Sequence, residues 1–188
     1  MALTKIDPVH GVDLADKEYF QVALTTATTG HADSASIVVD FGGNGTVKYD
    51  TKSNFDSSLD AYQFDSADGV YLISFSMGLR SDAVSTETIF DAGARVQFST
   101  DDFANTISEH EFGSASRLVD AGDDGVGSAT FQGQTIFKNT SSNMKIRVQG
   151  RVNTSSGTYE IEADTNGMLS TTFGTSTRCT YLSVVRIA

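Results

Sequence analysis

The sequence predicts an all-β protein, an antiparallel β-sandwich, on three observations. Short apolar stretches alternate with turns rich in Ser, Thr, Asp and Asn at spacings of about 8 to 12 residues, which is typical of a sandwich. The chain has 17 glycines, one proline and no tryptophan. No window has the apolar periodicity of a long amphipathic helix. With 188 residues, the chain can form one substantial domain that buries roughly 70% of its unfolded surface.

The clearest strand prediction is the stretch 68–77, around which we expect the rest of the chain to be organised. Ser74 and Ser76 lie on one face of this strand. The other face carries large apolar side chains: Tyr71, Ile73, Phe75 and Met77. This period of two is typical of a strand with one face in a core, and Asp68-Gly69 supplies the turn that precedes it.

Four strands are expected before this stretch, on the same alternation: 19–25, 34–41, 46–50 and 61–65. The glycine-rich stretch 42–45, between the second and the third of these strands, predicts a hairpin turn.

After the stretch 68–77, residues 78–92 are expected to form a mixed connection and residues 101–113 a polar loop. The later strands are expected at 93–100, 114–121, 129–138, 144–152, 158–163, 168–173 and 178–187. Residues 153–157 make the pair 144–152 and 158–163 a hairpin, and Gly133 predicts a bulge.

Residues 1–18 differ from the domain expected over 19–188, because their apolar side chains are scattered among charges. We expect an extended arm that binds a partner or a neighbouring subunit; the alternative is a frayed terminus. The side chains expected to make that contact are Leu3, Ile6, Val9 and Val12.

The charge and cysteine content exclude several classes of protein. With 24 acidic and 13 basic side chains, the net charge is −11, which repels nucleic-acid phosphates, so no nucleic-acid partner is expected. The single cysteine, Cys179, excludes an internal disulfide framework. No apolar run is long enough for a membrane span or a secretion signal, so we expect synthesis in the cytoplasm and no membrane contact.

No motif predicts catalysis, a metal site or a cofactor. The three histidines, His10, His31 and His110, lack the spacing of metal ligands. No serine is framed by a nucleophile elbow. The acidic turn 120–125 lacks the register of a calcium loop. We therefore expect a protein that is not an enzyme.

The first half of the chain carries a recognisable pattern of aromatic, glycine and turn residues: Val38, Phe41, Asn44, Gly45, Tyr49, Phe55, Phe64, Gly69, Tyr71 and Phe75. This pattern resembles the C1q/TNF-like family, the globular heads of complement type and of tumour necrosis factor. The similarity covers roughly residues 34 to 188, and Ile73 stands where that family usually has a phenylalanine. The closing stretch 180–187 is similar to the last strand of phage and bacterial members.

The resemblance implies a TNF-like jelly roll of two antiparallel sheets that assembles as a homotrimer, with apolar and aromatic side chains along its threefold axis. It also implies binding and assembly rather than catalysis. The residues expected in the trimer or core strands are Tyr71, Ile73, Phe75, Phe173 and Tyr181.

On this basis the expected function is that of a trimeric capsid decoration (cement) protein of a tailed phage, which stabilises the head by bridging capsid subunits. Its expected partners are copies of itself and the major capsid protein, and its expected location is the capsid surface of the virion. Each subunit of one trimer would make a weak contact with the capsid. Once one contact has formed, it raises the effective concentration of the other two at the capsid surface, so the three contacts act together. The alternative is a receptor- or glycan-binding head of a phage tail fibre or spike, which would expose aromatic side chains such as Phe103 or Phe112.

Overall fold

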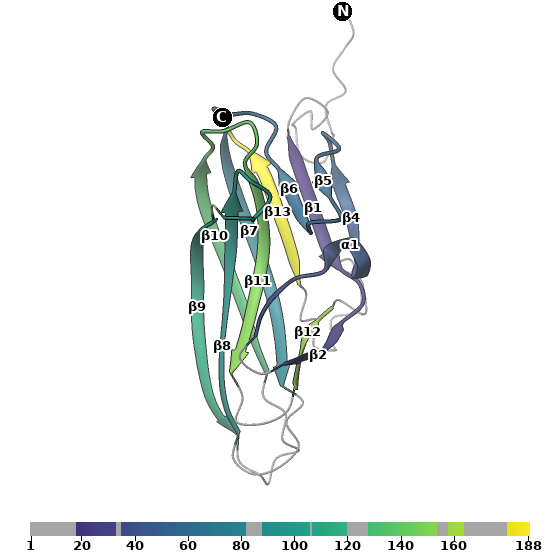
Figure 1. Cartoon of the computed structure of the whole chain (residues 1–188), viewed down its shortest axis with the longest axis vertical. Coiled ribbons are helices and arrows are strands. Elements are labelled where there is room, and N and C mark those ends of the chain that lie inside the picture. Colours follow the sequence, from purple (N-terminus) through teal and green to yellow (C-terminus); the bar gives the residue numbers. More distant parts are fainter. Residues whose placement is uncertain are drawn as a thin grey trace, which may run out of the picture.

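The computed structural model describes residues 18–32, 35–81, 88–105, 107–119, 128–153, 158–163 and 180–188. Within these ranges the chain folds into two antiparallel sheets that pack face to face, with their apolar side chains between them (Figure 1). The prediction of an antiparallel β-sandwich is therefore confirmed.

The seven-stranded sheet is organised around β7, the strand predicted at the centre of the fold. β10 pairs with β7 along its length, from Lys138 opposite Val70 to Ser128 opposite Arg80. On the other edge, β13 pairs with one half of β7, followed by β1 and β4; β12 pairs with the other half, followed by β2. The strands of this sheet are β1 (Tyr19–Leu24), β2 (Thr28–Ala32), β4 (Gly45–Asp50), β7 (Val70–Ser81), β10 (Ser128–Lys138), β12 (Thr158–Glu162) and β13 (Tyr181–Arg186).

The six-stranded sheet has the order β5-β6-β11-β8-β9, and β3 also pairs with β11. β11 and β8 pair over nine residues, from Lys145 opposite Ser99 to Asn153 opposite Asp91. The strands of this sheet are β3 (Ser36–Val38), β5 (Phe55–Asp56), β6 (Ala61–Gln63), β8 (Thr88–Ser99), β9 (Ile107–Val119) and β11 (Lys145–Asn153).

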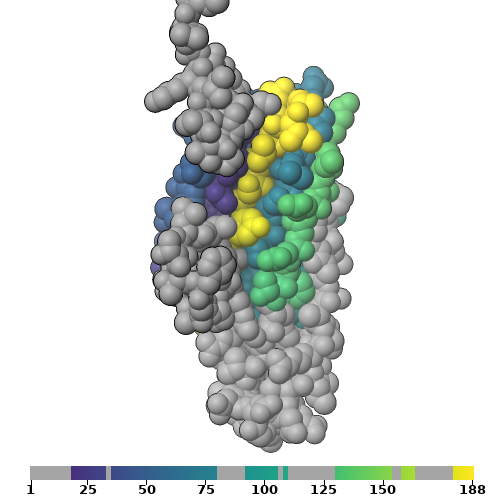
Figure 2. Space-filling model, turned by 180° about the vertical axis from the view of Figure 1, so that it is seen from behind, coloured from purple at the N-terminus to yellow at the C-terminus, as the bar shows by residue number. Residues whose placement is uncertain are grey.

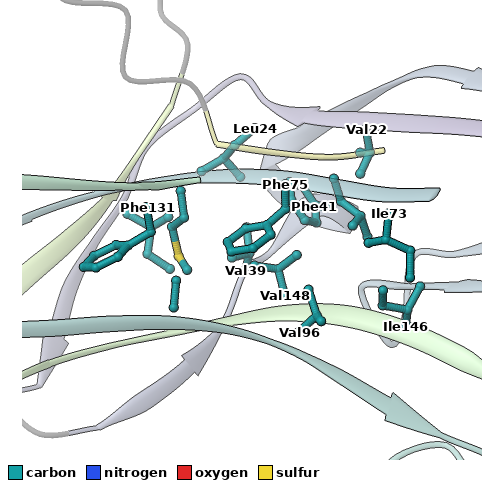
Figure 3. Packing of buried hydrophobic residues seen from close by; sticks show 14 of the residues in the cluster. Val22, Leu24, Val39, Phe41, Ile73, Phe75, Val96, Phe131, Ile146 and Val148 are labelled. Atoms are coloured by element: carbon teal, nitrogen blue, oxygen red, sulfur yellow. The ribbon is translucent and has the colours of Figure 1, made fainter. Parts of the chain in front are cut away.

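The core lies between the sheets and contains the apolar face of β7. Tyr71 and Ile73 are 0% exposed and Phe75 is 1% exposed. In Figure 3, Ile73 and Phe75 point toward Val96 and Val148 of the opposite sheet. Toward one end of the sandwich the core is aromatic. Stacked, tilted and edge-to-face contacts, with ring centroids 4.3 to 6.4 Å apart, connect Phe20, Tyr62, Phe64, Tyr71, Phe98 and Phe137.

A buried carboxylate fixes the chain to the sandwich immediately before β1. Glu18 is 1% exposed. Its Oε1 accepts hydrogen bonds from the Tyr62 hydroxyl and the Asp65 backbone N–H, both at 2.8 Å, and its Oε2 accepts one from the Tyr71 hydroxyl at 2.6 Å. Its backbone oxygen accepts a fourth from Arg186 N–H. Since these partners come from three different segments (62–65, β7 and β13), the chain enters β1 at a fixed point.

Several parts of the fold differ from the sequence prediction. The hairpin predicted from the stretches 144–152 and 158–163 does not form, because β11 belongs to the six-stranded sheet and β12 to the seven-stranded sheet. The predicted strand 34–41 is a strand only over Ser36–Val38, and the predicted hairpin turn at 42–45 is largely a one-turn helix, α1 (Phe41–Asn44). The Asp40 carboxylate caps this helix by accepting from Gly43 N–H at 2.7 Å. A hairpin is impossible here because β3 and β4 belong to different sheets. β2 was not predicted at all.

The long central strands also exceed their predicted limits. β7 runs to Ser81 and β8 starts at Thr88, inside the predicted connection 78–92. β9 covers the second half of the predicted loop 101–113, because its backbone pairs with β8 although its sequence is polar. The bulge expected at Gly133 is absent, since β10 pairs with β7 without a shift in register. The predicted strand 168–173 lies outside the described residues.

A substitution of Phe75 tests how far the stability of the core depends on the side chains of β7. We expect Phe75→Ala to lower the free energy of unfolding by about 3–5 kcal/mol, because it removes a fully buried ring and leaves a cavity. Urea denaturation measures this change. The control is Arg151→Ala, on an exposed position of β11, which should change stability by less than about 0.5 kcal/mol. A loss from Phe75→Ala no larger than that of the control would contradict the packing described.

Stability should also fall at alkaline pH. Burial raises the pKa of Tyr159 to about 12, and burial, followed by the neighbouring Glu18, raises the pKa of Tyr62 and Tyr71 above the ordinary value. The unfolded chain releases these protons at about pH 10. The stabilisation is therefore fully present below about pH 10 and is lost as pH rises toward the folded pKa.

Unfolding in urea as a function of pH measures this loss. Tyr159→Phe removes one titrating group, so its free energy of unfolding should decline less steeply above about pH 10 than that of the natural sequence. If the free energy of unfolding declined with pH equally steeply in the two proteins, the fold would not oppose ionisation of the Tyr159 hydroxyl.

Candidate functional site

The residues predicted for the trimer or core strands fall into two groups in the structure. Tyr71, Ile73 and Phe75 are buried between the sheets, where they stabilise the sandwich and are not available to another subunit. Tyr181 is half-buried on the opposite, outer face of the seven-stranded sheet. Phe173 and the arm residues Leu3, Ile6, Val9 and Val12 lie outside the described residues.

The outer face of the seven-stranded sheet is formed by the side chains that alternate with the core residues. Figure 2 looks onto this face, with β13 in yellow between β1 and β7, and β10 beyond β7. The registers of β1, β13, β7 and β10 align its side chains in three rows across the four strands. The rows are Tyr19-Val185-Leu72-Ile136, Gln21-Ser183-Ser74-Gln134 and Ala23-Tyr181-Ser76-Gln132. We call these twelve positions the uncharged face.

The first row of the uncharged face is apolar across all four strands. Ile136, at its β10 end, is 67% exposed. Beyond its β1 end, Tyr49 of β4 is 53% exposed and its ring centroid lies 5.1 Å from that of Tyr19. Directly opposed side chains on neighbouring strands contact one another, so the four residues of the row form a continuous apolar band. Tyr49 lies opposite Gln21 in the register and extends this band diagonally through its contact with the Tyr19 ring.

Ten of the twelve positions are at least partly exposed, whereas Ala23 and Ser76 are buried. None of the twelve carries a charge, although 20% of the chain's residues are charged. A surface exposed only to water usually carries charges, whereas the centre of a protein–protein interface is depleted of them. The Gln and Ser side chains of the second and third rows can still hydrogen-bond across such a contact. The composition of this face is therefore that of an interface.

The outer face of the six-stranded sheet is different, because an ion pair and hydrogen bonds link several of its described charged side chains. Glu109 accepts hydrogen bonds from Arg95 and from Gln97 Nε2. Gln97 Oε1 in turn accepts one from Arg147 Nε at 2.8 Å, and Arg95 Nε donates to Gln149 at 2.6 Å. Such a network of satisfied polar groups is suited to contact with water. The two outer faces therefore differ in chemistry, and the uncharged face is the candidate functional site.

One expected binding residue is not exposed. Phe103 is only 8% exposed, because the guanidinium carbon of Arg147 lies 3.9 Å from its ring centroid. The expectation that Phe103 is an exposed aromatic contact of a receptor-binding head is therefore wrong. The side chain of Phe112 is not among the side chains that the structure describes.

Groups that could support chemistry are few in the part of the chain that the structure describes. No cluster of three or more His, Cys, Asp or Glu side chains there could hold a metal ion. His31 packs against Tyr159 with ring centroids 5.2 Å apart, and its Nε2 lies 2.8 Å from the Thr28 hydroxyl. Within the same ranges, no helix has the length and apolar character needed to cross a membrane.

Comparison with known proteins gives no match in sequence: no protein-family model and no curated protein matches the chain. Solved structures match it along most of its length. The structure of Eiger TNF from S. frugiperda aligns with a TM-score of 0.55 and 7% identity, covering 92% of this chain and 93% of that chain. Murine APRIL at pH 8.5 aligns with a TM-score of 0.50 and 13% identity, covering 92% and 100%.

The globular domain of the zebrafish complement 1qA protein aligns with a TM-score of 0.44 and 13% identity, covering 92% of this chain and 98% of that chain. The fold itself is established by the two alignments with the higher scores. The chain has the antiparallel jelly-roll fold of the tumour necrosis factor type, as the resemblance in its sequence implied.

Proposed function

We propose that this protein is a structural protein that assembles as a homotrimer through the uncharged face. The observation that carries this proposal is the absence of charge from twelve positions on four neighbouring strands, with an apolar row at one side. Burying the row between subunits would stabilise the assembly by about 25 cal/mol per Å² of apolar surface. Covering it with another copy also explains why Ile136 is apolar at an exposed position.

The shape of the apolar row suits a closed ring. Its two ends, Ile136 on β10 and Tyr49 beside Tyr19, lie at opposite sides of the same sheet. In a cyclic assembly one copy contributes one end of the row and its neighbour contributes the other, and the ring closes without leaving an unused surface. The C1q/TNF-like resemblance of the sequence supports three copies rather than another number.

The specific role that we propose is decoration of a phage capsid, with the major capsid protein as partner and the virion surface as location. Two observations support it. The closing strand, 180–187, is similar in sequence to that of phage members of the family, and the chain is fixed to the sandwich at Glu18, next to the segment 1–17 that would contact the capsid. The role is one of binding and assembly, with no enzymatic step.

The proposed interface predicts the effect of a charge at Ile136. We expect Ile136→Asp to convert the trimer into monomers, because a carboxylate would have to lose its hydration inside an apolar contact that offers it no partner. Sedimentation velocity at several protein concentrations measures the assembly state.

The control for this variant is a charge change on the other sheet. Arg151 is exposed on the outer face of β11, so Arg151→Asp should leave the trimer intact. Thermal denaturation of both variants shows whether each protomer stays folded. A folded Ile136→Asp variant that is still a trimer would place the interface elsewhere on the molecule.

The proposed role of the arm predicts a separation of assembly from capsid binding. A chain that starts at Glu18 retains the carboxylate bound to Tyr62 and Tyr71, so it should fold and form trimers. It should bind purified capsids of the same virus at least tenfold more weakly than the full chain, because the arm contacts are lost. Equal coating by the two chains, measured by co-sedimentation, would show that residues 1–17 are not the capsid-binding segment.

A further inference from the structure

A polar pocket lies at the edge of the six-stranded sheet, away from the uncharged face. Its volume is about 460 Å³. It is formed by the segment around β5, by β6 and by the first residue of β11. The side chains that matter for its chemistry are Asn54, Phe55, Asp56, Ser57, Gln63 and Lys145.

The charged groups of the pocket are already paired. Lys145 Nζ lies 3.2 Å from Asp56 Oδ2 and 2.7 Å from Asp102 Oδ1, and its side chain is 12% exposed. The hydrogen bond from the Ser58 hydroxyl, together with Lys145, lowers the pKa of Asp56. Burial alone would lower the pKa of Lys145, but its hydrogen bonds with Asp102 and Asp56 raise it. Asp56 and Lys145 are therefore both charged at neutral pH.

This charge arrangement selects the kind of ligand. A cation would have to displace the ammonium group that already lies between the two carboxylates, and an anion would meet two negative charges against one positive charge. The ligand that fits is therefore neutral. β5 has only two residues, which is too short an edge for an added peptide strand to pair with.

Several hydrogen-bonding groups around the charged pair remain available. Among the described residues, the side chains of Asn54 and Ser57 have no hydrogen-bond partner. Gln63 Nε2 donates to the Ser142 carbonyl at 3.1 Å, which leaves Gln63 Oε1 to accept from a ligand. Amide and hydroxyl groups supply both donors and acceptors, and the Phe55 ring adds an apolar surface. This combination is complementary to a ring that carries hydroxyl groups on an apolar frame.

The backbone of the pocket is fixed before any ligand binds. The Asp50 carboxylate accepts from Asn54 N–H at 3.1 Å and from Phe55 N–H at 3.0 Å, and Gln63 N–H donates to the Asn54 carbonyl at 3.0 Å. The Phe55 ring is stacked on Phe20, which belongs to the core, at 5.5 Å. A rigid site loses little conformational entropy on binding.

We propose that this pocket binds a neutral saccharide, with the amide of Asn54, the hydroxyl of Ser57 and the carbonyl oxygen of the Gln63 side chain as hydrogen-bonding groups. The pocket and the uncharged face belong to different sheets, so the site does not depend on the proposed assembly. In a trimer, three such sites would be presented together and would increase the avidity for a surface that carries many copies of the sugar.

The test is saturation-transfer difference NMR on the full chain with three separate probes: glucose, galactose and N-acetylglucosamine, with glycerol as the reference polyol. At least one sugar should receive saturation and glycerol should not. For that sugar, Asn54→Ala should weaken binding at least tenfold, because the variant removes the free amide but keeps the backbone hydrogen bonds of residue 54. The control, Arg151→Ala at an exposed position of β11 that does not line the pocket, should bind as the natural sequence does.

Thermal denaturation confirms that both variants are folded, and Ile136→Asp separates the two proposals, because sugar binding should survive in that variant whether or not it is a trimer. No saturation transfer to any of the three sugars would overturn the proposal. Equal transfer to glycerol, or unchanged binding by folded Asn54→Ala, would also overturn it, since the contact would then be non-specific or elsewhere.

Discussion

The pairing of β7 on both of its edges is the constraint on which the rest of the structure depends. β10 occupies one edge, and β13 and β12 share the other. With its backbone fixed on both sides, the strand cannot shift register, so its alternate side chains are assigned to two surfaces. Ile73 is buried against the other sheet, and Leu72 lies in the apolar row of the uncharged face. One strand therefore positions both the core and the candidate interface.

The two sheets have outer faces of different chemistry, which suggests a division of roles. On the six-stranded sheet, Arg95, Gln97 and Glu109 satisfy one another's hydrogen bonds, so the surface is compatible with water. On the seven-stranded sheet the corresponding positions are uncharged and partly apolar, a composition that favours contact with protein. A subunit that assembles through one sheet keeps the other free, and the polar pocket beside Lys145 lies on that free side.

The strands with strict alternation could be predicted from the sequence because their apolar side chains repeat with a period of two. This is why β7, β11 and β13 were placed correctly. The second half of β9 lies in the predicted strand 114–121, but its first half could not be recognised, because the polar sequence Ile-Ser-Glu-His-Glu becomes a strand only through pairing with β8. The prediction of a hairpin turn at 42–45 was wrong for a related reason. β3 and β4 belong to different sheets, and the local sequence does not show which sheet a strand joins.

The candidate site was harder to predict than the fold. The alternation of β7 identifies Leu72, Ser74 and Ser76 as one face, but the rows form only once four strands from distant parts of the chain are in register. Glu18 was expected in the arm, and no local signal shows that its carboxylate is buried between Tyr62 and Tyr71. Both features depend on contacts between residues far apart in sequence, which a periodic pattern does not encode.

The most direct test of this account is the absolute mass of the natural protein in solution, measured by light scattering on the eluting peak of a sizing column. The account predicts a single species of three times 20.0 kDa that persists on dilution, because the uncharged face is covered in the trimer. A monomer of 20.0 kDa at every concentration would contradict it, since the uncharged face would then be stably exposed to water.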